Sequence, residues 1–318
     1  MFKILVPALA FSVVCLCSSA RADEAEEKAV ALAEKLDGKV FRNERVPGRP
    51  VTALRLYGPK VTDAELKQLV ALKNLILLDL NRTAVTDAGL KELVALKNLE
   101  NLSITGLTDA SLKELAPLKS LTALQLYGPK VTDAGLKELV ALKGLTKLGL
   151  ADTAVTDAGL KDLAAFDGLK KLSLHGTKVT GPGLKELAPL KGLTELGLSM
   201  SSMTDAGLKE LAAIKGLTEL DLSYTKVTDA GLKDLAASKS LSKLVLYNTQ
   251  VTDAGLKELA ALKGLKQLHL SGMSVTDAGL TELAALKDLA YLYLSSTKVT
   301  DTGVKQLKSV LPKCSIEK

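Results

Sequence analysis

Apolar residues recur along the chain in one arrangement that repeats about every 24 residues. In one unit, Val61–Leu72 carries apolar residues at the three- and four-residue spacing that is typical of an amphipathic helix. Leu75–Leu80 follows and ends in Leu-x-Leu, the alternation that predicts a short strand. Each unit is therefore predicted to consist of a strand, a turn, a helix and a second turn.

The helical half of each unit opens with Val-Thr-Asp-Ala-Gly-Leu-Lys-Glu-Leu or a variant of it. Eleven copies begin at Val61, Val85, Leu107, Val131, Val155, Val179, Met203, Val227, Val251, Val275 and Val299. Thr62 or Asp63 is expected to cap the helix amino end, and Lys73 lies at the opposite end of the helix dipole. A strict period of this length predicts a solenoid, because a lone unit buries too little apolar surface to fold.

The stack is expected to curve. Parallel strands pair at ~4.8 Å, whereas helices pack at about 8 to 10 Å, so the helical side must be longer. The strands are therefore predicted to line a concave face and the helices a convex one.

The run Leu75-x-x-Leu78-x-Leu80-x-x-Thr83, followed by Val85-Thr-Asp-Ala-Gly-Leu90, resembles the leucine-rich repeat, in particular its ribonuclease-inhibitor-like and cysteine-containing classes. The resemblance covers roughly residues 49–318 and implies an α/β horseshoe that binds other proteins on its concave face. The chain departs from the cysteine-containing class by placing Thr where that class has Cys, at Thr83, Thr153, Thr177, Thr225, Thr249 and Thr297. A Thr hydroxyl is expected to satisfy backbone groups of the turn.

The first 22 residues have the pattern of a secretory signal peptide. Lys3 precedes an apolar run from Ile4 to Cys17, and Ala20-Arg21-Ala22 provides a cleavage site after Ala22. The run is too short to span a bilayer of ~30 Å, so no membrane insertion is expected after cleavage. The protein is predicted to be exported, and the choice between periplasm and extracellular space stays open. Cleavage removes Cys15 and Cys17 and leaves Cys314 as the one cysteine of the mature chain. We interpret Cys314 as a buried side chain of a carboxyl-terminal cap.

Residues 23–48 are predicted to close the amino-terminal end of the stack, which then occupies residues 49–318. Asp23–Leu36 has the spacing of a capping helix that stops at Gly38, and Val40-Phe41 predicts a strand before the Pro47-Gly48 turn.

The charge argues against a nucleic-acid partner. The net charge is +6, and loss of Lys3 and Arg21 with the leader lowers it to +4. Lysines such as Lys91 recur beside acidic residues such as Glu92 on the predicted helices, which is typical of a solvated face.

The repeats differ from one another mainly at the strand positions that flank the leucines, which alternation turns toward solvent. Five of the six tyrosines and both histidines fall there, and tyrosine favours interfaces. The candidate partner-binding residues are Arg55, Tyr57, Tyr127, His175, Glu195, Glu219, Asp221, Tyr247, His269, Tyr291 and Tyr293. Tyr247, Tyr291 and Tyr293 are predicted to form an aromatic anchor, and Glu219 with Asp221 an acidic patch.

No catalytic residue, metal ligand or cofactor site is predicted. His175 and His269 lie four repeats apart, too far to share a metal ion. The predicted concave strand face is open and shallow, so it would remove little water from a pair of carboxylates. This disfavours an enzyme active site there. We expect a non-enzymatic, monomeric protein-protein interaction module of the cell envelope or extracellular space. The alternatives left open are a passive structural spacer and a polysaccharide-binding protein.

Overall fold

The computed structural model describes residues 24–318, so the predicted signal peptide over residues 1–22 lies outside the described residues. The chain divides into two compact units between Ile104 and Thr105. This boundary coincides with the turn at Thr105-Gly106, in a repeat that begins 22 rather than 24 residues after the preceding one. Both units are built from the same strand, turn and helix pattern.

The first unit begins with a helix over residues 24–35, in which Ala29 and Ala33 are buried. Its other elements are β1 (Lys39–Arg42), β2 (Val51–Arg55), α2 (Asp63–Leu69), β3 (Leu77–Leu80), the 3-10 helix η1 (Gly89–Ala95) and β4 (Asn101–Thr105). β1 pairs antiparallel with β2, whereas β2, β3 and β4 pair parallel. The strand predicted at Val40-Phe41 is thus confirmed.

The second unit contains nine strands that pair parallel in chain order. These are β5 (Ala123–Tyr127), β6 (Lys147–Ala151), β7 (Lys171–Ser173), β8 (Glu195–Gly197), β9 (Glu219–Asp221), β10 (Lys243–Val245), β11 (Gln267–His269), β12 (Tyr291–Tyr293) and β13 (Ser315–Glu317). Neighbouring strands are in register at a spacing of 24 residues, as with Leu244 and Leu268. The sequence period therefore equals one step across the sheet.

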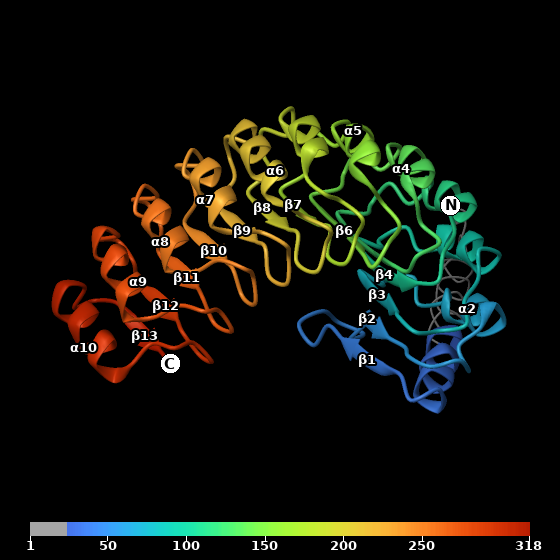
Figure 1. Ribbon diagram of the computed structural model, residues 1–318. Coiled ribbons are helices and arrows are strands. Elements are labelled where there is room, and N and C mark those ends of the chain that lie inside the picture. The colour runs from blue at the N-terminus through green and yellow to red at the C-terminus, as the bar shows by residue number, and fades with distance from the viewer. Residues whose placement is uncertain (1–23) are drawn as a thin grey trace, which may run out of the picture. The chain divides into compact units, whose positions relative to one another are not determined.

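The helical segments of the second unit are short, and several are 3-10 rather than α-helical. They are α3 (Asp109–Leu112), η2 (Lys113–Leu115), α4 (Asp133–Leu139), η3 (Asp157–Gly159), α5 (Leu160–Leu163), η4 (Pro182–Leu187), α6 (Asp205–Leu208), η5 (Lys209–Ala213), α7 (Asp229–Leu235), α8 (Asp253–Leu259), α9 (Asp277–Glu282), η6 (Leu283–Ala285) and α10 (Asp301–Val310). Within this unit they lie along the outer side of the curved strand array (Figure 1). The predicted α/β solenoid, with parallel strands and peripheral helices, is confirmed.

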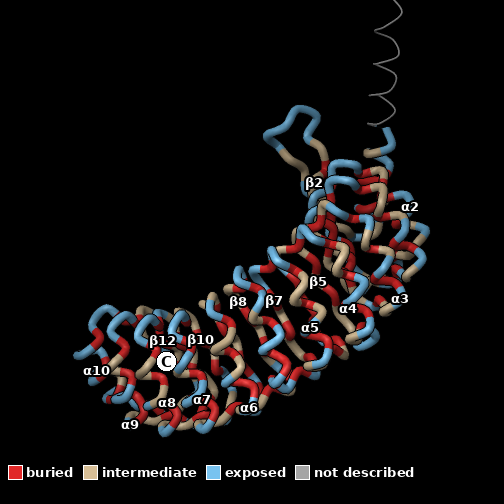
Figure 2. Tube along the Cα trace, turned by 90° about the horizontal axis from the view of Figure 1, so that it is seen from above, coloured by how far each residue is buried: buried red, intermediate tan, exposed pale blue. Residues whose placement is uncertain are grey.

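The core consists of leucines that occupy equivalent places in every repeat, and buried positions recur at the same place in successive coils (Figure 2). In one repeat, seven apolar side chains are at most 1% exposed: Val251, Leu256, Leu259, Leu262, Leu265, Leu268 and Leu270. Both leucines of Leu-x-Leu point into this core, so the residues beside them lie on the opposite face of the strand.

The Thr and Asp of each Val-Thr-Asp-Ala-Gly block have separate tasks. Thr252 caps α8 by accepting a hydrogen bond from the Ala254 amide at 3.4 Å. Asp229 of the preceding repeat accepts from the Thr252 amide and hydroxyl, both at 2.7 Å. The same bridge joins Asp109 to Thr132, Asp133 to Thr156, Asp205 to Thr228, Asp253 to Thr276 and Asp277 to Thr300.

The glycine of the same block leaves room for this bridge. A Cβ on Gly255 would lie 2.4 Å from Asp229 Oδ1, which excludes a side chain there without movement of the carboxylate. The bridge is missing where Gly181 replaces the aspartate, and Thr204 instead donates its hydroxyl to the Thr180 carbonyl at 3.3 Å. That repeat continues as the 3-10 helix η4, which begins at Pro182.

The threonines that stand where the cysteine-containing class has Cys satisfy backbone carbonyls. Thr177 Oγ1 donates to the Leu174 carbonyl oxygen at 2.7 Å, and the same i to i−3 bond forms at Thr83, Thr153, Thr225, Thr249 and Thr297. The predicted role of these hydroxyls is therefore confirmed.

Candidate binding surface

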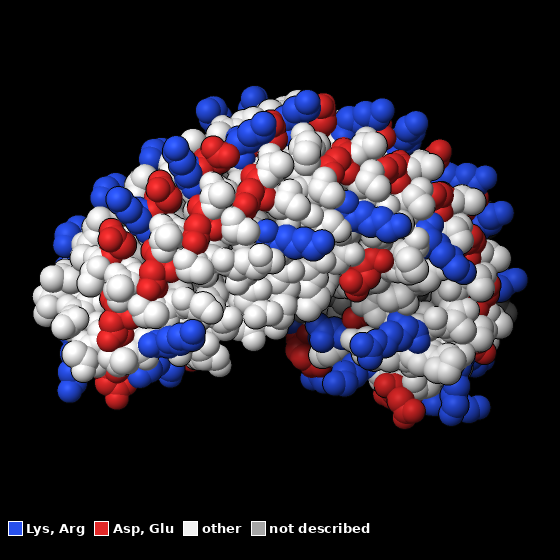
Figure 3. All heavy atoms as spheres, viewed as in Figure 1, with Lys and Arg blue, Asp and Glu red and all other residues white. Residues whose placement is uncertain are grey.

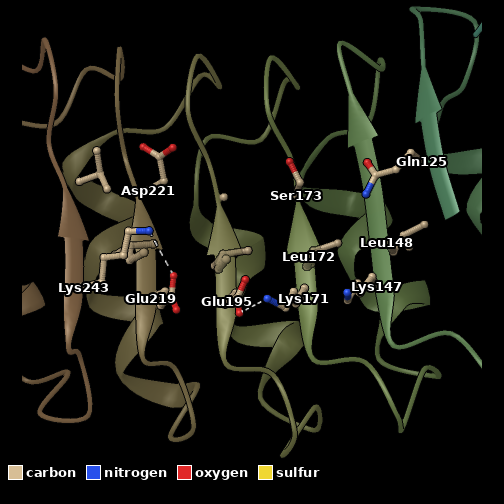
Figure 4. Close-up of a pocket in the computed structure, with 14 residues that line it drawn as sticks. Gln125, Lys147, Leu148, Lys171, Leu172, Ser173, Glu195, Glu219, Asp221 and Lys243 are labelled. Carbon is tan, nitrogen blue, oxygen red and sulfur yellow. Dashed lines mark ion pairs between the residues drawn. The ribbon is translucent and has the colours of Figure 1, made fainter. Parts of the chain in front are cut away.

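The strand face of the second unit, defined here as the solvent side of β5–β13, presents a row of charged residues. Register pairs Lys147 with Lys171, Lys171 with Glu195, Glu195 with Glu219, and Glu219 with Lys243. These side chains lie along a hollow of about 330 Å³, and Figure 4 shows them projecting from successive strands. Like charges lie side by side at Lys147 and Lys171 and again at Glu195 and Glu219.

The carboxylates of this row are paired with lysines rather than left as an acidic patch. Glu195 forms an ion pair with Lys171, and Glu219 Oε2 lies 3.4 Å from Lys243 Nζ. Asp221 Oδ1 accepts hydrogen bonds from the Ser223 amide at 2.9 Å and hydroxyl at 2.5 Å. The hollow holds three lysines and three carboxylates, so its formal charge is balanced. The prediction of an acidic patch at Glu219 and Asp221 is corrected accordingly.

A first aromatic pair lies at the ends of β9 and β10. The rings of Tyr224 and Tyr247 meet edge to face, with centroids 5.0 Å apart and an interplanar angle of 77°. The pKa of Tyr224 is raised by its hydrogen bond with Tyr247, with burial and the charge of that neighbour contributing less. Gly272 belongs to the next turn, and a Cβ there would lie 3.2 Å from Tyr247 Cε2.

A second aromatic group lies on β11 and β12. The His269 ring stacks on Tyr293 with centroids 4.0 Å apart, and Tyr291 is 53% exposed on the same strand as Tyr293. Burial lowers the pKa of His269, and Lys243 lowers it further against the opposing effect of Asp221 and Glu317. Among the described residues, no ring contact joins Tyr247 to Tyr291 or Tyr293, so the three predicted anchors form two separate groups.

Two other candidates lie nearer the start of the second unit. His175 Nδ1 is 2.8 Å from Ser199 Oγ, and the side chain is half-buried. Tyr127 is also half-buried, at the end of β5. Neither belongs to the aromatic groups of β9–β12.

Arg55 and Tyr57 belong to the first unit and form their own small cluster. The Arg55 guanidinium lies over the Phe41 ring, 5.5 Å from its centroid. The Tyr57 hydroxyl donates to Asp79 Oδ2 at 2.9 Å, and this bond raises the pKa of Tyr57. Phe41 is exposed and was not among the sequence candidates. It lies in β1, which pairs with β2, so the predicted strand at Val40-Phe41 could have suggested it as a neighbour of Arg55.

The main residues that sequence reasoning missed lie just beyond the strands. Ser223 flanks Leu222, so strand alternation would turn it toward solvent, but Ser223 is 7% exposed and Tyr224 is 42% exposed. β9 ends at Asp221, and the chain then turns with Tyr224 in the left-handed region at φ 55°. Met200 takes the same place one repeat earlier, at φ 55°, and is 52% exposed. Period-two alternation cannot be extended into a turn, and this is why both residues were overlooked.

The described residues offer no centre for metal chemistry. Within residues 24–318, no three His, Cys, Asp or Glu side chains gather closely enough to hold a metal ion. No helix in that range has the length and apolar character needed to cross a bilayer. Basic side chains follow the outer helical rim, with acidic side chains in rows beside them (Figure 3). A continuous basic stripe is not seen in that view.

Comparison with known proteins agrees with this fold. Residues 208–316 match a family model described as Zer-1-like, leucine-rich repeats. A search of curated proteins found no match.

Three solved structures illustrate the likeness. The internalin InlF of Listeria monocytogenes is 21% identical, with a TM-score of 0.56 over 91% of this chain and 93% of its own. A leucine-rich-repeat protein of Leptospira interrogans is 22% identical, with a TM-score of 0.49 over 79% of this chain and 80% of its own. Internalin C2 of Listeria monocytogenes is 24% identical, with a TM-score of 0.44 over 74% of this chain and 84% of its own. At these identities the likeness concerns the fold alone, and this chain adopts the fold of the leucine-rich-repeat solenoids.

Proposed function

We propose that this protein is a non-enzymatic interaction module that binds another protein through the strand face of its second unit. Leucine-rich repeats generally mediate protein-protein interaction. The observation that carries the proposal is the contrast between a core of leucines and the large aromatic side chains exposed on the strand face. Tyr247 and Tyr291 are 38% and 53% exposed, although the chain has few aromatic residues and its described core is aliphatic except at positions such as Phe166.

Tyrosine suits this role because it offers a large contact area and a hydroxyl at a low entropy cost. The Tyr224 and Tyr247 pair and the His269 and Tyr293 stack hold their rings in fixed relative orientations. A surface that is ordered before binding loses less conformational entropy when a partner arrives. The ion pairs of Glu195 and Glu219 support orientation of a partner more than affinity, because exposed pairs contribute little.

Site-specific photocrosslinking in the native cell tests this proposal. A photoreactive residue replaces Tyr291 in the full chain, and a matched control carries it at Lys137 on α4. We expect a protein adduct from position 291 and none from position 137. The triple variant Tyr247→Ala, Tyr291→Ala, Tyr293→Ala should weaken capture of that protein at least about tenfold, as loss of an aromatic hot spot does. Adducts that are identical at both positions would contradict the proposal.

The same experiment separates the alternatives. A saccharide adduct at position 291 would favour polysaccharide binding over a protein partner. A passive spacer would keep its cellular role when one whole unit, such as residues 251–274, is deleted. An enzyme would show a turnover that disappears in Glu219→Gln. Export is part of the proposal, and amino-terminal sequencing of the mature protein should find Asp23 first.

A further inference from the structure

The turn that follows each of the strands β5–β12 contains one residue in the left-handed region. Within residues 24–318, five of the eleven residues at this place in a repeat are glycines, which adopt this conformation without strain. In the second unit the others are Asp152, Met200, Tyr224, Asn248 and Ser296. Asp and Asn tolerate the left-handed region better than most residues, whereas bulky side chains are genuine outliers there. Met200 and Tyr224 are therefore the two unexpected members of this column.

Burial does not compensate these two residues for the strain. Met200 is 52% exposed and Tyr224 is 42% exposed, so neither side chain is fixed by the core. They occupy equivalent places in adjacent repeats, and their amides donate to the carbonyls of Ser223 and Tyr247. Tyr247 completes the group through its edge-to-face contact with Tyr224. Strained residues that are exposed and apolar indicate a surface kept for a contact rather than for stability.

The turns that carry this group contain basic residues and no acidic ones. The four turns over residues 176–178, 200–202, 224–226 and 248–250 contain Lys178 and Lys226 and no acidic residue. Both lysines are exposed, and neither forms an ion pair within residues 24–318. Two carboxylates lie beside these turns: Asp221 is hydrogen-bonded to Ser223, and the Asp152 carboxylate lies against Gly176.

We propose that the rim patch, defined as Met200, Tyr224, Tyr247, Lys178 and Lys226, docks an acidic segment of a partner protein that also carries an aromatic or apolar side chain. The apolar side chain lies on Met200, Tyr224 and Tyr247, and the carboxylates of the segment meet Lys178 and Lys226. This inference rests on the proposed function and specifies the chemistry of the partner. Charge complementarity selects an acidic segment over a neutral or basic one.

Synthetic peptides test the proposal directly. The probe is a fluorescein-labelled peptide in which Asp and Phe residues are separated by Gly and Ser, titrated with the full chain by fluorescence anisotropy. Two matched peptides replace every Asp with Lys or every Phe with Ser. We expect the Asp and Phe peptide to bind at least about tenfold more tightly than either, and its affinity to fall with salt. Equal affinities, a preference for the basic peptide or no binding would overturn the proposal.

Variants of the chain separate a docking role from a structural one. Met200→Gly with Tyr224→Gly places in these two turns the residue that the equivalent turns at Gly176 and Gly272 already carry. The double variant should bind the peptide at least about tenfold more weakly while its melting temperature stays equal or rises. Lys178→Ser with Lys226→Ser should lose affinity and most of the salt dependence. Ser296→Gly removes a side chain from the same left-handed conformation outside the patch and should leave peptide affinity unchanged. A loss of affinity in the Ser296→Gly variant would overturn the assignment of binding to the rim patch.

The two proposals fail separately. A protein crosslinked at position 291 whose capture is unaffected by Met200→Gly with Tyr224→Gly would overturn the rim patch and leave the proposed function intact. Absence of any protein adduct at position 291 would overturn the proposed function itself.

Discussion

Replacement of Gly255 by Ala provides a sharp test of the bridge between repeats. In the interior of an exposed helix this change normally stabilises a protein by up to about 1 kcal/mol. Gly255 lies in α8, but a Cβ there would lie 2.4 Å from Asp229 Oδ1 and 2.9 Å from Val251 Cγ1. The carboxylate must therefore move, and it cannot do so without losing its contacts with Thr252.

The size of the effect follows from those contacts. Asp229 accepts two hydrogen bonds from Thr252, both at 2.7 Å. A hydrogen bond to a charged group contributes roughly 1.5 kcal/mol or more, so the loss of both costs about 3 kcal/mol. Subtraction of about 1 kcal/mol gained in helix propensity leaves Gly255→Ala destabilising by about 2 kcal/mol. Urea unfolding followed by circular dichroism measures this difference.

Two further variants make the result decisive. Gly264 lies in a turn where a Cβ would be 3.7 Å from the Lys239 carbonyl oxygen, so Gly264→Ala should change stability by less than about 0.5 kcal/mol. With Asp229→Ala already present, Gly255→Ala should instead stabilise by less than about 1 kcal/mol, because the side chains of Val251 and Leu232 must still shift slightly to admit the Cβ. If Gly255→Ala has the same sign in both backgrounds, the carboxylate is not what requires glycine and the reasoning is refuted.

Three other predictions follow from contacts in the second unit. The hydrogen bond from the Thr300 hydroxyl lowers the pKa of Asp277 in the folded protein. The resulting stabilisation is fully present above the unfolded pKa of about 4 and is lost as the pH falls through the folded pKa. Thr300→Val should therefore reduce the loss of melting temperature at acid pH. Thr177→Val should cost about 1 kcal/mol in urea unfolding, because the Leu174 carbonyl loses its hydroxyl donor and keeps only the longer bond from the Thr177 amide at 3.3 Å, whereas Thr177→Ser should retain most of the stability. Lys171→Met should cost less than about 1 kcal/mol, since its ion pair with Glu195 is exposed, and the difference should shrink in high salt.

The fold could be predicted from the sequence because one pattern is repeated many times. A single Leu-x-Leu predicts a strand weakly, but repeated copies at a spacing of 24 residues also predict the register, since residue 244 must neighbour residue 268. The same spacing could have shown the ion pairs in advance. Lys171 and Glu195 are 24 residues apart, as are Glu219 and Lys243. The acidic patch was predicted from Glu219 and Asp221 without Lys243 on the adjacent strand, which pairs with Glu219, and it was therefore incorrect.

The division of labour between Thr and Asp could not be predicted from one unit. Both residue types cap helices, and a sequence of a single repeat makes Thr62 and Asp63 equivalent candidates. In the structure Thr62 accepts from the Ala64 amide, whereas Asp63 accepts from the Thr86 amide in the following repeat. That choice depends on how far apart the stacked coils lie, which is a property of the assembled core rather than of the local sequence.

Departures from the repeat differ in what they indicate about function. The segment Tyr57-Gly-Pro-Lys60 recurs as Tyr127-Gly-Pro-Lys130, so duplication alone can place a tyrosine on the strand face. Duplication does not explain Tyr224, because the equivalent residues are Met200 and Asn248 in the adjacent turns and the unstrained Gly176 and Gly272 two repeats away. A side chain held in the left-handed region loses roughly 1 to 2 kcal/mol relative to an unstrained backbone. An exposed residue that carries this cost without burial is stronger evidence for a contact surface than an aromatic residue at an ordinary strand position.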